Sequence, residues 1–265
     1  MFWKVLVLIM VALSVTGSEV ESAKRVEIVA HRGASYVAPE NTLASINLAW
    51  EMNADAVEID IYLTVDQQII VSHDSDTARA TGIEMSIPKS NFEDLRKLDA
   101  GKWKDAAYTG EKLPTLEEVL KTIPKGKRIL MEVKCGPEVI PIFLDQLKKS
   151  RKSDKQVAVI SFNIDVIRAI KEVRPRMKAY WLTVPTPGSA DALIAAIKKI
   201  KADGLDLAST DAIDAEFVRK VHDAKLKLYI WTVDDTTTGK RLADYGVDGI
   251  TTNKPDQMLA AIKPR

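Results

Sequence analysis

The stretch AVEIDIYLTVDQQIIVSHD, residues 56–74, contains the two features that decide the fold. Its first seven residues form an apolar run in which Glu58 and Asp60 occupy alternate positions. Since every second residue of a strand points to the same face, the two carboxylates share one face and the aliphatic side chains take the other. We predict a buried strand whose aliphatic side chains pack on outer helices and whose carboxylates point into the interior.

The second feature is the short apolar run at residues 69–72. Too few residues separate Tyr62 from Ile69 for a helical crossover, which needs about a dozen residues or more. We therefore predict that this run is the return arm of a hairpin that extends the preceding strand beyond the sheet.

Similar apolar runs recur along the chain, with helical periodicity between most of them. The further runs cover residues 26–30, 128–133, 157–161, 179–183, 204–208, 226–232 and 249–251. Without the hairpin arm, eight runs remain. Strands that alternate with helices predict a parallel sheet. Eight such units favour an α/β fold of the closed (β/α)8 TIM barrel type, about 250 residues long, over a doubly wound open sheet.

Helix signals between the runs agree with this pattern. A capping box begins at Thr115, and Asn41 is placed to cap another helix. Further helices are predicted for residues 191–201, 214–224 and 234–245, each of which begins with Asp.

Residues 75–112 break the rhythm, because they contain several turn signals and little clean periodicity. We predict a small insertion here, after the second strand region. It follows the C-terminal end of a strand, which is the end where the active sites of such barrels lie.

The N-terminus is a separate segment. Lys4 precedes an unbroken apolar run at residues 5–13, and small and polar residues follow. This order is typical of a signal peptide, and the run is too short to span a bilayer comfortably. We predict a signal peptide at residues 1–23, cleaved after residue 17 or 23, and a barrel domain at 24–265. The protein is then periplasmic or secreted, without stable membrane insertion after processing. An uncleaved anchor is the competing interpretation.

The composition excludes several classes of protein. Lys plus Arg number 38 and Asp plus Glu number 37, so no excess of positive charge points to a nucleic acid partner. The single cysteine, Cys135, excludes an intrachain disulfide and a cysteine-rich zinc site. Histidine chemistry is restricted to His31, His73 and His222.

Three carboxylates are predicted to meet at one barrel mouth. Glu132 ends another strand and shares a face with Lys134, two residues later, so it is placed to join Glu58 and Asp60. Buried carboxylates need paired cations or a metal. Oxygen ligands of this kind suit Mg²⁺ or Ca²⁺, so we predict one divalent cation. Salt bridges to Arg32 or Lys134 are the alternative.

Two histidines are predicted at the same mouth. His31 and Arg32 end the first strand, and His73 ends the hairpin arm. General acid–base catalysis needs one proton acceptor and one donor, and Arg holds a phosphate or carboxylate with two parallel hydrogen bonds. The alternative is a histidine bonded to the backbone or facing water. Phe162 and Trp231 lie near strand ends, where they either form an apolar wall beside the site or pack in the core.

The order of these motifs resembles the glycerophosphodiester phosphodiesterase family, in a bacterial, exported form. The resemblance rests on His-Arg-Gly at 31–33, Pro-Glu-Asn-Thr at 39–42, Glu-Ile-Asp at 58–60 and Ser-His-Asp at 72–74. It continues through further motifs to near Pro255.

The resemblance implies metal-dependent hydrolysis of small-molecule glycerophosphodiesters to glycerol 3-phosphate and an alcohol, in lipid and glycerol metabolism. It implies an acid–base pair of His31 and His73, metal ligands Glu58, Asp60 and Glu132, phosphate contacts Arg32 and Lys134, and substrate-lining residues Phe162 and Trp231. Direct attack by water and attack by the glycerol 2-hydroxyl through a cyclic phosphate both stay open. So does the choice of which histidine is the acid.

Two other functions compete with this one. The first is a related TIM-barrel phospholipase that acts on lysophospholipids. The second is a non-catalytic binding protein on the same scaffold, since a fold alone does not establish an activity. One departure from the family is Gln67, where the family often has Gly, so the hairpin turn is expected to differ.

Overall fold

The computed structural model describes residues 25–262, and the predicted signal peptide lies outside them. Eight parallel strands of this part of the chain close into a barrel, because β1 pairs with β9 on one side and with β2 on the other. This confirms the predicted (β/α)8 TIM barrel. In their order around the barrel, the strands are β1 (Glu27–His31), β2 (Ala56–Leu63), β4 (Arg128–Val133), β5 (Val157–Ser161), β6 (Lys178–Thr183), β7 (Gly204–Ala208), β8 (Lys227–Trp231) and β9 (Gly249–Thr252).

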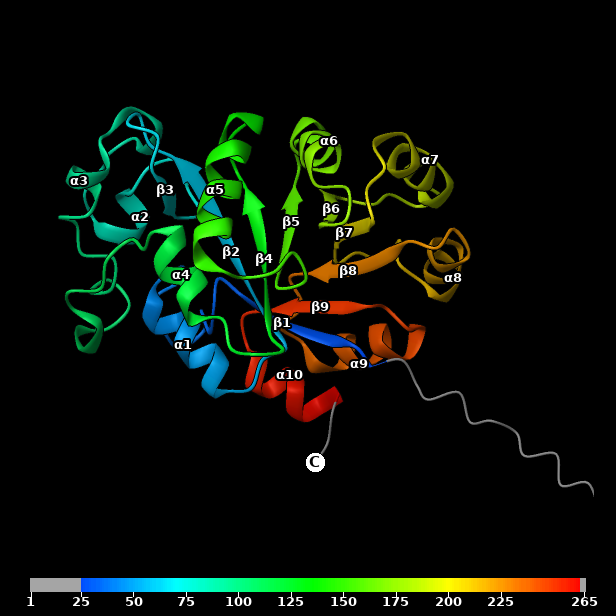
Figure 1. The fold of residues 1–265 in the computed structure, drawn as a ribbon. Helices are drawn as coiled ribbons and strands as arrows, with labels where there is room; N and C mark the ends of the chain where they lie inside the picture. Colours follow the sequence, from blue (N-terminus) through cyan, green and yellow to red (C-terminus); the bar gives the residue numbers. More distant parts are fainter. Residues whose placement is uncertain (1–24, 263–265) are drawn as a thin grey trace, which may run out of the picture.

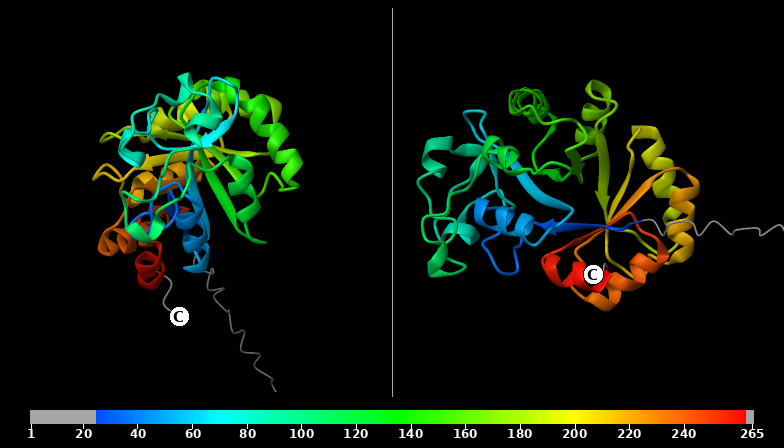
Figure 2. Two further views of the ribbon diagram at one scale, coloured as in Figure 1. Left: turned by 90° about the vertical axis from the view of Figure 1, so that its left-hand side faces the viewer. Right: turned by 60° about the horizontal axis from the view of Figure 1, so that its bottom comes forward.

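Helices surround the strands in all three ribbon views (Figure 1, Figure 2). After the last helix the described chain ends beside β1 and α9, against which α10 packs. The helices of the barrel are α1 (Leu43–Glu51), α4 (Leu116–Thr122), α5 (Ile140–Ser150), α6 (Ile164–Val173), α7 (Ala190–Ile200), α8 (Ala215–Asp223), α9 (Thr236–Tyr245) and α10 (Pro255–Ile262).

The predicted hairpin is confirmed, because β3 (Ile69–Val71) pairs antiparallel with β2. Its turn contains Gln67, whose φ of +59° lies in the left-handed region that glycine adopts most readily. The Gln67 N–H donates to the Thr64 carbonyl at 3.0 Å. The tight turn is therefore made without the glycine that the family often has.

The caps of three helices differ from the prediction. Ser189, not Asp191, is the N-cap of α7, whereas the caps of α1 and α9 differ for a common reason. Thr42, not Asn41, is the N-cap of α1, and Asp235 caps α9 one residue after the expected Asp234. The side chains of Asn41 and Asp234 are both used elsewhere, on Asp60 and on Asn253 respectively. In each case a partner distant in the sequence competes with the local backbone for a short polar side chain.

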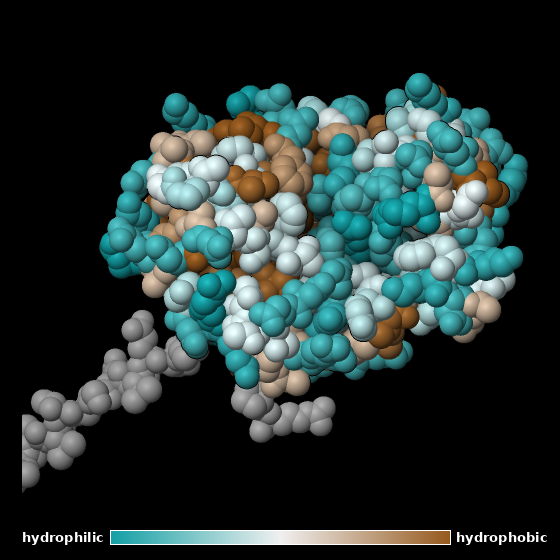
Figure 3. Space-filling view, turned by 180° about the vertical axis from the view of Figure 1, so that it is seen from behind, coloured by the Kyte–Doolittle hydropathy of each residue, from teal (hydrophilic) through white to brown (hydrophobic). Residues whose placement is uncertain are grey.

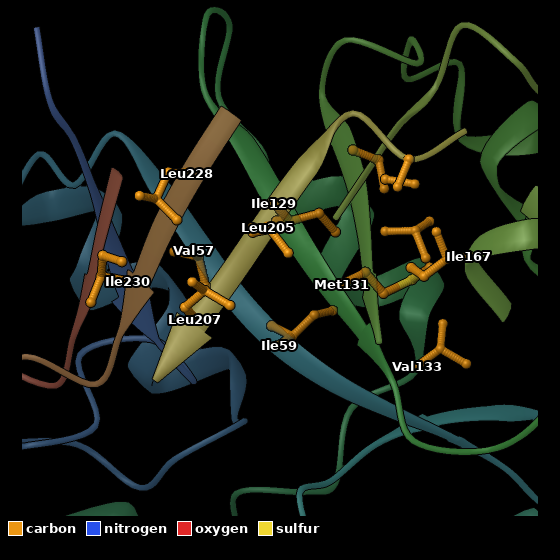
Figure 4. Packing of buried hydrophobic residues seen from close by; sticks show 14 of the residues in the cluster. Val57, Ile59, Ile129, Met131, Val133, Ile167, Leu205, Leu207, Leu228 and Ile230 are labelled. Atoms are coloured by element: carbon orange, nitrogen blue, oxygen red, sulfur yellow. The ribbon is translucent and has the colours of Figure 1, made fainter. Parts of the chain in front are cut away.

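The core has two layers, as the alternation in the strands requires. Between the strands and the helices lie the outward side chains, such as Val57, Ile59, Met131 and Leu205 (Figure 4). Burying one such side chain stabilises the fold by about 1.5–3 kcal/mol. Inside the barrel lies a smaller cluster that consists of Val29, Ala56, Leu130, Ala158, Ile160, Tyr180, Leu182 and Tyr229.

Residues 75–112 lie beside β2 and β3, on the left of Figure 1. They contain the short helices α2 (Ala78–Thr81), η1 (Ile87–Lys89), α3 (Phe92–Leu95) and η2 (Ala106–Tyr108). A separate apolar cluster, which includes Ile87 and Leu95, packs under them.

The molecular surface is polar on the face that Figure 3 shows, where hydrophobic residues form only small, scattered areas. None of the helices within residues 25–262 has both the length and the apolar character needed to cross a bilayer.

Candidate active site

A cavity of about 240 Å³ opens where the barrel strands end. Every site residue predicted from the sequence except Asp60 lines it, namely His31, Arg32, Glu58, His73, Glu132, Lys134, Phe162 and Trp231. The mouth therefore collects side chains from strands and loops far apart in the sequence. It does so at the end of the barrel where parallel strands deliver their C-terminal residues.

The three predicted carboxylates meet below this mouth. Asp60 on β2 is in register with Glu132 on β4, and oxygen atoms of Glu58, Asp60 and Glu132 lie within 4.8 Å of one another. Glu58 and Asp60 are buried, and the Glu132 side chain is 12% exposed. Burial and the neighbouring carboxylates raise the pKa of Glu58 well above its usual range and that of Glu132 to about 7.

Cations surround this cluster without neutralising it. The Lys134 ammonium lies 2.8 Å from Glu132 and 3.6 Å from Asp60, and Arg32 Nε lies 3.4 Å from Asp60. The salt bridges to Arg32 and Lys134, which the sequence analysis left open as the alternative to a metal, are thus present. Two fixed positive charges nevertheless face three carboxyl groups, so a deficit of positive charge remains.

Unbonded oxygens point to the missing charge. The Glu58 Oε1 and Asp60 Oδ1 atoms are buried and have no hydrogen-bond partner among residues 25–262. Their second oxygens are fixed, because the Arg32 N–H donates to Glu58 Oε2 at 2.9 Å and the Asn41 amide donates to Asp60 Oδ2 at 2.8 Å. Oriented, unbonded carboxylate oxygens are the ligands that Mg²⁺ and Ca²⁺ take, so this donor set fits a divalent cation.

His31 is held in one orientation by a chain of hydrogen bonds. Its Nδ1 lies 2.8 Å from Asn253 Oδ1, and the Asn253 amide donates to Asp234 at 2.7 Å. This leaves Nε2 toward the cavity, 3.9 Å from Glu58. Burial and the nearby Arg32 charge lower the pKa of His31 to about 4, so the ring is neutral near pH 7.

His73 has a different environment. It follows β3 on the hairpin, its side chain is 30% exposed, and its Nδ1 lies 2.6 Å from Asp74 Oδ1. The second Asp74 oxygen accepts a hydrogen bond from Arg79 Nε at 2.6 Å. Arg79 also donates twice to Glu40, at 2.9 and 2.7 Å.

Glu40 connects this network to the other side of the mouth, because Arg32 donates to it at 3.0 Å. Arg79 in α2 therefore ties His73 to Arg32 through two acidic side chains. We call Arg32, Glu40, Asp74 and Arg79 the mouth network.

The backbone that presents Arg32 depends on Gly33. Arg32 and Gly33 both have positive φ, +55° and +81°. A Cβ atom at Gly33 would lie 2.5 Å from the Ser45 backbone, which is far inside van der Waals contact. The tight turn packs against the start of α1 and aims the guanidinium into the mouth.

Two aromatic side chains form one wall of the cavity. The rings of Phe162 and Trp231 make an edge-to-face contact with centroids 5.7 Å apart. Phe162 is 48% exposed, which places it at the rim and not in the core. The sequence left open whether these residues form an apolar wall or pack in the core. Both lie in the apolar wall.

Several polar residues of the site are given no role at the site by the sequence-based prediction. Asn41, Asn253 and Asp234 orient a carboxylate or a histidine, and Asp206 is a further buried acid of the cavity wall. Asn253 and Asn41 lie inside motifs that carry the family resemblance. That position in the motifs is the feature of the sequence from which a role at the site could have been predicted. Asp206 lies in one of the apolar runs, and the only sign of a special role is that it is an acid among aliphatic residues.

Comparison with known proteins places the chain among phosphodiesterases. The sequence model of the glycerophosphoryl diester phosphodiesterase family matches residues 31–257. A glycerophosphodiester phosphodiesterase of Bacillus subtilis is 33% identical over 254 residues, covering 89% of this chain and 86% of the relative. One of Caldanaerobacter subterraneus is 32% identical, over 89% of this chain and 97% of the relative.

A solved structure agrees with these relatives. An Oleispira antarctica phosphodiesterase, determined in complex with the product sn-glycerol-3-phosphate, superposes with a TM-score of 0.83 at 29% identity. The match covers 89% of this chain and 96% of that one.

Proposed function

The chain belongs to the glycerophosphoryl diester phosphodiesterase family and is a phosphoric diester hydrolase, and we propose that it releases glycerol 3-phosphate from glycerophosphodiesters by metal-dependent, two-histidine catalysis. The observation that carries the proposal is the mouth itself. Three clustered carboxylates, of which Glu58 and Asp60 each have an unbonded oxygen, lie at one cavity with two fixed cations and two differently held histidines. The product bound to the Oleispira relative supports a small-molecule substrate.

Charge neutralisation on the phosphoryl oxygens is the first requirement of the reaction. Arg32 and Lys134 are placed to donate to these oxygens from two sides of the cavity. A Mg²⁺ or Ca²⁺ ion held by Glu58, Asp60 and Glu132 supplies further positive charge when bound. Loss of one such fixed donor costs about 3–4 kcal/mol in the transition state.

Proton transfer is assigned to the histidines. His31 is neutral and its Nε2 faces the cavity, so it accepts the proton of the attacking hydroxyl group. His73 is the second histidine of the cavity, and its Nδ1 is held by Asp74, so we assign to it the proton donation to the departing alkoxide. The assignment holds whether water or the glycerol 2-hydroxyl attacks first.

Release of glycerol 3-phosphate from a panel of glycerophosphodiesters tests the activity, with a chelator and then with Mg²⁺ or Ca²⁺ restored. His31→Asn and His73→Asn are each expected to lose about 10²- to 10⁴-fold in kcat. His222→Asn is the matched control, because this third histidine is on α8 and does not line the cavity. Full turnover by either cavity variant would overturn the two-histidine assignment. Full turnover with chelator would overturn the metal dependence.

The lysophospholipase alternative is not favoured by the relatives, which are named for glycerophosphodiesters. The same panel separates the two functions when it includes an intact lysophospholipid beside its deacylated form. Preference for the intact lipid would replace the proposed substrate.

We propose in addition that the protein is exported to the periplasm or the medium and serves lipid and glycerol metabolism there. The apolar run at residues 5–13 and its flanks support this location. The intact mass of protein recovered from outside the cytoplasm is expected to correspond to cleavage after residue 17 or 23. Recovery of the full-length chain in the membrane fraction would favour the uncleaved anchor.

A further inference from the structure

A buried acid in the cavity is not used by the chemistry described above. Asp206 on β7 is 1% exposed, and its Oδ1 has no hydrogen-bond partner among residues 25–262. Burying an acid without a partner costs several kcal/mol, roughly 2–7 for a neutral polar group and more for a charged one. Such a group persists where a ligand supplies the missing hydrogen bond.

Asp206 is separated from the three metal-binding candidates. In the ring of eight strands, β7 lies four positions from β2 in either direction, so Asp206 faces Glu58 and Asp60 from the opposite wall. It is not among the carboxylates that lie within 4.8 Å of one another. It therefore lines the same cavity as the triad from a different side.

The register of the strands places Asp206 at the floor of the cavity. Asp206 is level with Tyr229, whereas Ala208, two residues later, is level with Trp231. The Trp231 indole, which lines the wall above, donates to the Asp206 backbone carbonyl at 3.2 Å. Trp231 therefore lines the cavity one layer nearer to the C-terminal ends of the strands than Asp206.

The surroundings restrict the chemistry of that ligand group. Ile160, Leu182 and Trp231 line the cavity with apolar surface, which suits a short carbon skeleton. Thr251, which lines the same cavity, has a second buried polar atom, Oγ1, without a hydrogen-bond partner in the described part of the chain. Carbon atoms with free hydroxyl groups match an apolar wall that carries isolated polar atoms.

The glycerol half of the substrate has this chemistry and this position. Once Arg32 and Lys134 hold the phosphate, one half of the diester points to the floor and the other to the rim. The alcohol that leaves must reach solvent, so the rim suits it. The floor then takes the half that all glycerophosphodiesters share, whose free hydroxyl groups need partners when buried.

We propose that Asp206 accepts a hydrogen bond from a hydroxyl group of the glycerol half of the substrate and thereby selects glyceryl diesters. The proposal rests on the proposed function, since it names the substrate of the same site. Burial and the Glu132 charge raise the pKa of Asp206 well above its usual range. The protonated and the ionised carboxyl group can both accept a hydroxyl hydrogen.

Two diesters with the same p-nitrophenolate leaving group test the proposal, one glyceryl and one propyl, so that only the hydroxyl groups differ. The measured quantity is the ratio of their kcat/KM values. Asp206→Leu is expected to lower this ratio by about 10- to 100-fold, because only the glyceryl diester has a hydrogen bond to lose. Leu182→Val is the matched control, since it changes the volume of the same cavity without a polar group and keeps the ratio.

Thermal stability supplies a second readout. A ligand-binding role predicts that removing Asp206 raises the Tm, whereas a structural role predicts that it lowers the Tm. Without ligand, Asp206→Leu is expected to raise the Tm, because it removes a buried polar group that has no hydrogen-bond partner for its Oδ1 among residues 25–262. A lower Tm together with an unchanged ratio would show that Asp206 is structural and would overturn the proposal.

The remaining outcomes separate this proposal from the proposed function. If the unmodified enzyme hydrolyses glycerophosphodiesters and Asp206→Leu has the same ratio of kcat/KM values as the unmodified enzyme, the proposed function stands and the proposed role of Asp206 is wrong. If the enzyme hydrolyses no glycerophosphodiester, the function fails. The affinities for glycerol 3-phosphate and propyl phosphate, measured by calorimetry, then still test Asp206 without turnover. An equal loss of affinity for both ligands in Asp206→Leu would overturn its proposed role. Loss confined to choline or ethanolamine diesters would assign Asp206 to a cationic leaving group instead.

Discussion

At the residue scale, His31 and His73 show how one side-chain type is given two environments. His31 is buried, and its bond to Asn253 fixes the ring so that a neutral Nε2 faces the cavity. His73 is more exposed and lies against the Asp74 carboxylate. Burial disfavours the charged form of His31, which suits the role of proton acceptor that we propose for it.

Gly33→Ala tests the backbone that presents Arg32. A Cβ at this position meets the Ser45 backbone at 2.5 Å, so the turn must shift, and we expect a loss of stability of about 2–4 kcal/mol together with a fall in kcat/KM. Gly82→Ala is the control, because Gly82 also has positive φ but no atom lies within 4 Å of its Cβ position. It is expected to cost only about 1 kcal/mol. Equal losses in urea unfolding would contradict the steric argument.

At the element scale, the short helix α2 reaches the mouth from the insertion. Its Arg79 bridges Glu40 and Asp74, and these acids contact Arg32 and His73 respectively. Residues 75–112 are thus coupled by charged hydrogen bonds to Arg32 and His73, for which we propose a phosphate contact and a proton donor. Because a guanidinium offers donors on two edges, Arg suits this double contact better than Lys.

Arg79→Met is expected to lower kcat/KM by about tenfold, because Arg32 and His73 lose a shared support. Arg79→Lys is expected to recover little of this loss, since one ammonium cannot reproduce both contacts. Lys97→Met in the same insertion is the control, because its ion pair with Asp94 is exposed and distant from the mouth network. Steady-state kinetics on one glycerophosphodiester compare the three variants. A loss in Lys97→Met that matches Arg79→Met would contradict the network.

At the scale of the whole molecule, closure of the barrel forces three acids together. Glu58 and Asp60 come from β2 and Glu132 from β4, and the raised pKa values of Glu58 and Glu132 record the cost of burying them side by side. An acid whose pKa is raised by folding destabilises the folded state as pH rises through that pKa. A bound cation reverses this cost, so metal binding and stability are linked.

Mg²⁺ or Ca²⁺ is therefore expected to raise the Tm, with a gain of about 2.7 kcal/mol in the free energy of unfolding at 100 times Kd. The gain in stability is expected above pH 7 and is lost as pH falls, because Glu132, the proposed ligand whose pKa is about 7, must release its proton to bind the cation. Thermal unfolding at pH about 6 and about 8 measures this difference. Na⁺ at equal ionic strength is the control, and Glu132→Gln should reduce the shift. A Tm shift with Mg²⁺ or Ca²⁺ no larger than the shift with Na⁺ would contradict the proposed metal site.

Much of this molecule follows from periodicity alone. The alternation in residues 56–62 predicts a strand with carboxylates inward, and eight such runs predict the closed barrel, because a strand has only two faces and parallel strands share one mouth. The hairpin at β3 follows from the length of its connection. These features depend on spacing along the chain, which a sequence records directly.

Contacts between residues far apart in the chain were decided only by the tertiary structure. The helix caps predicted at Asn41 and Asp234 are wrong because each side chain meets a polar partner brought near by closure of the barrel. The mouth network likewise depends on which strands face one another across the ring, and so does Asp206, whose Oδ1 has no hydrogen-bond partner within residues 25–262. A sequence states which polar groups are available, whereas burial and distance decide which partner each of them has and which are left for a ligand.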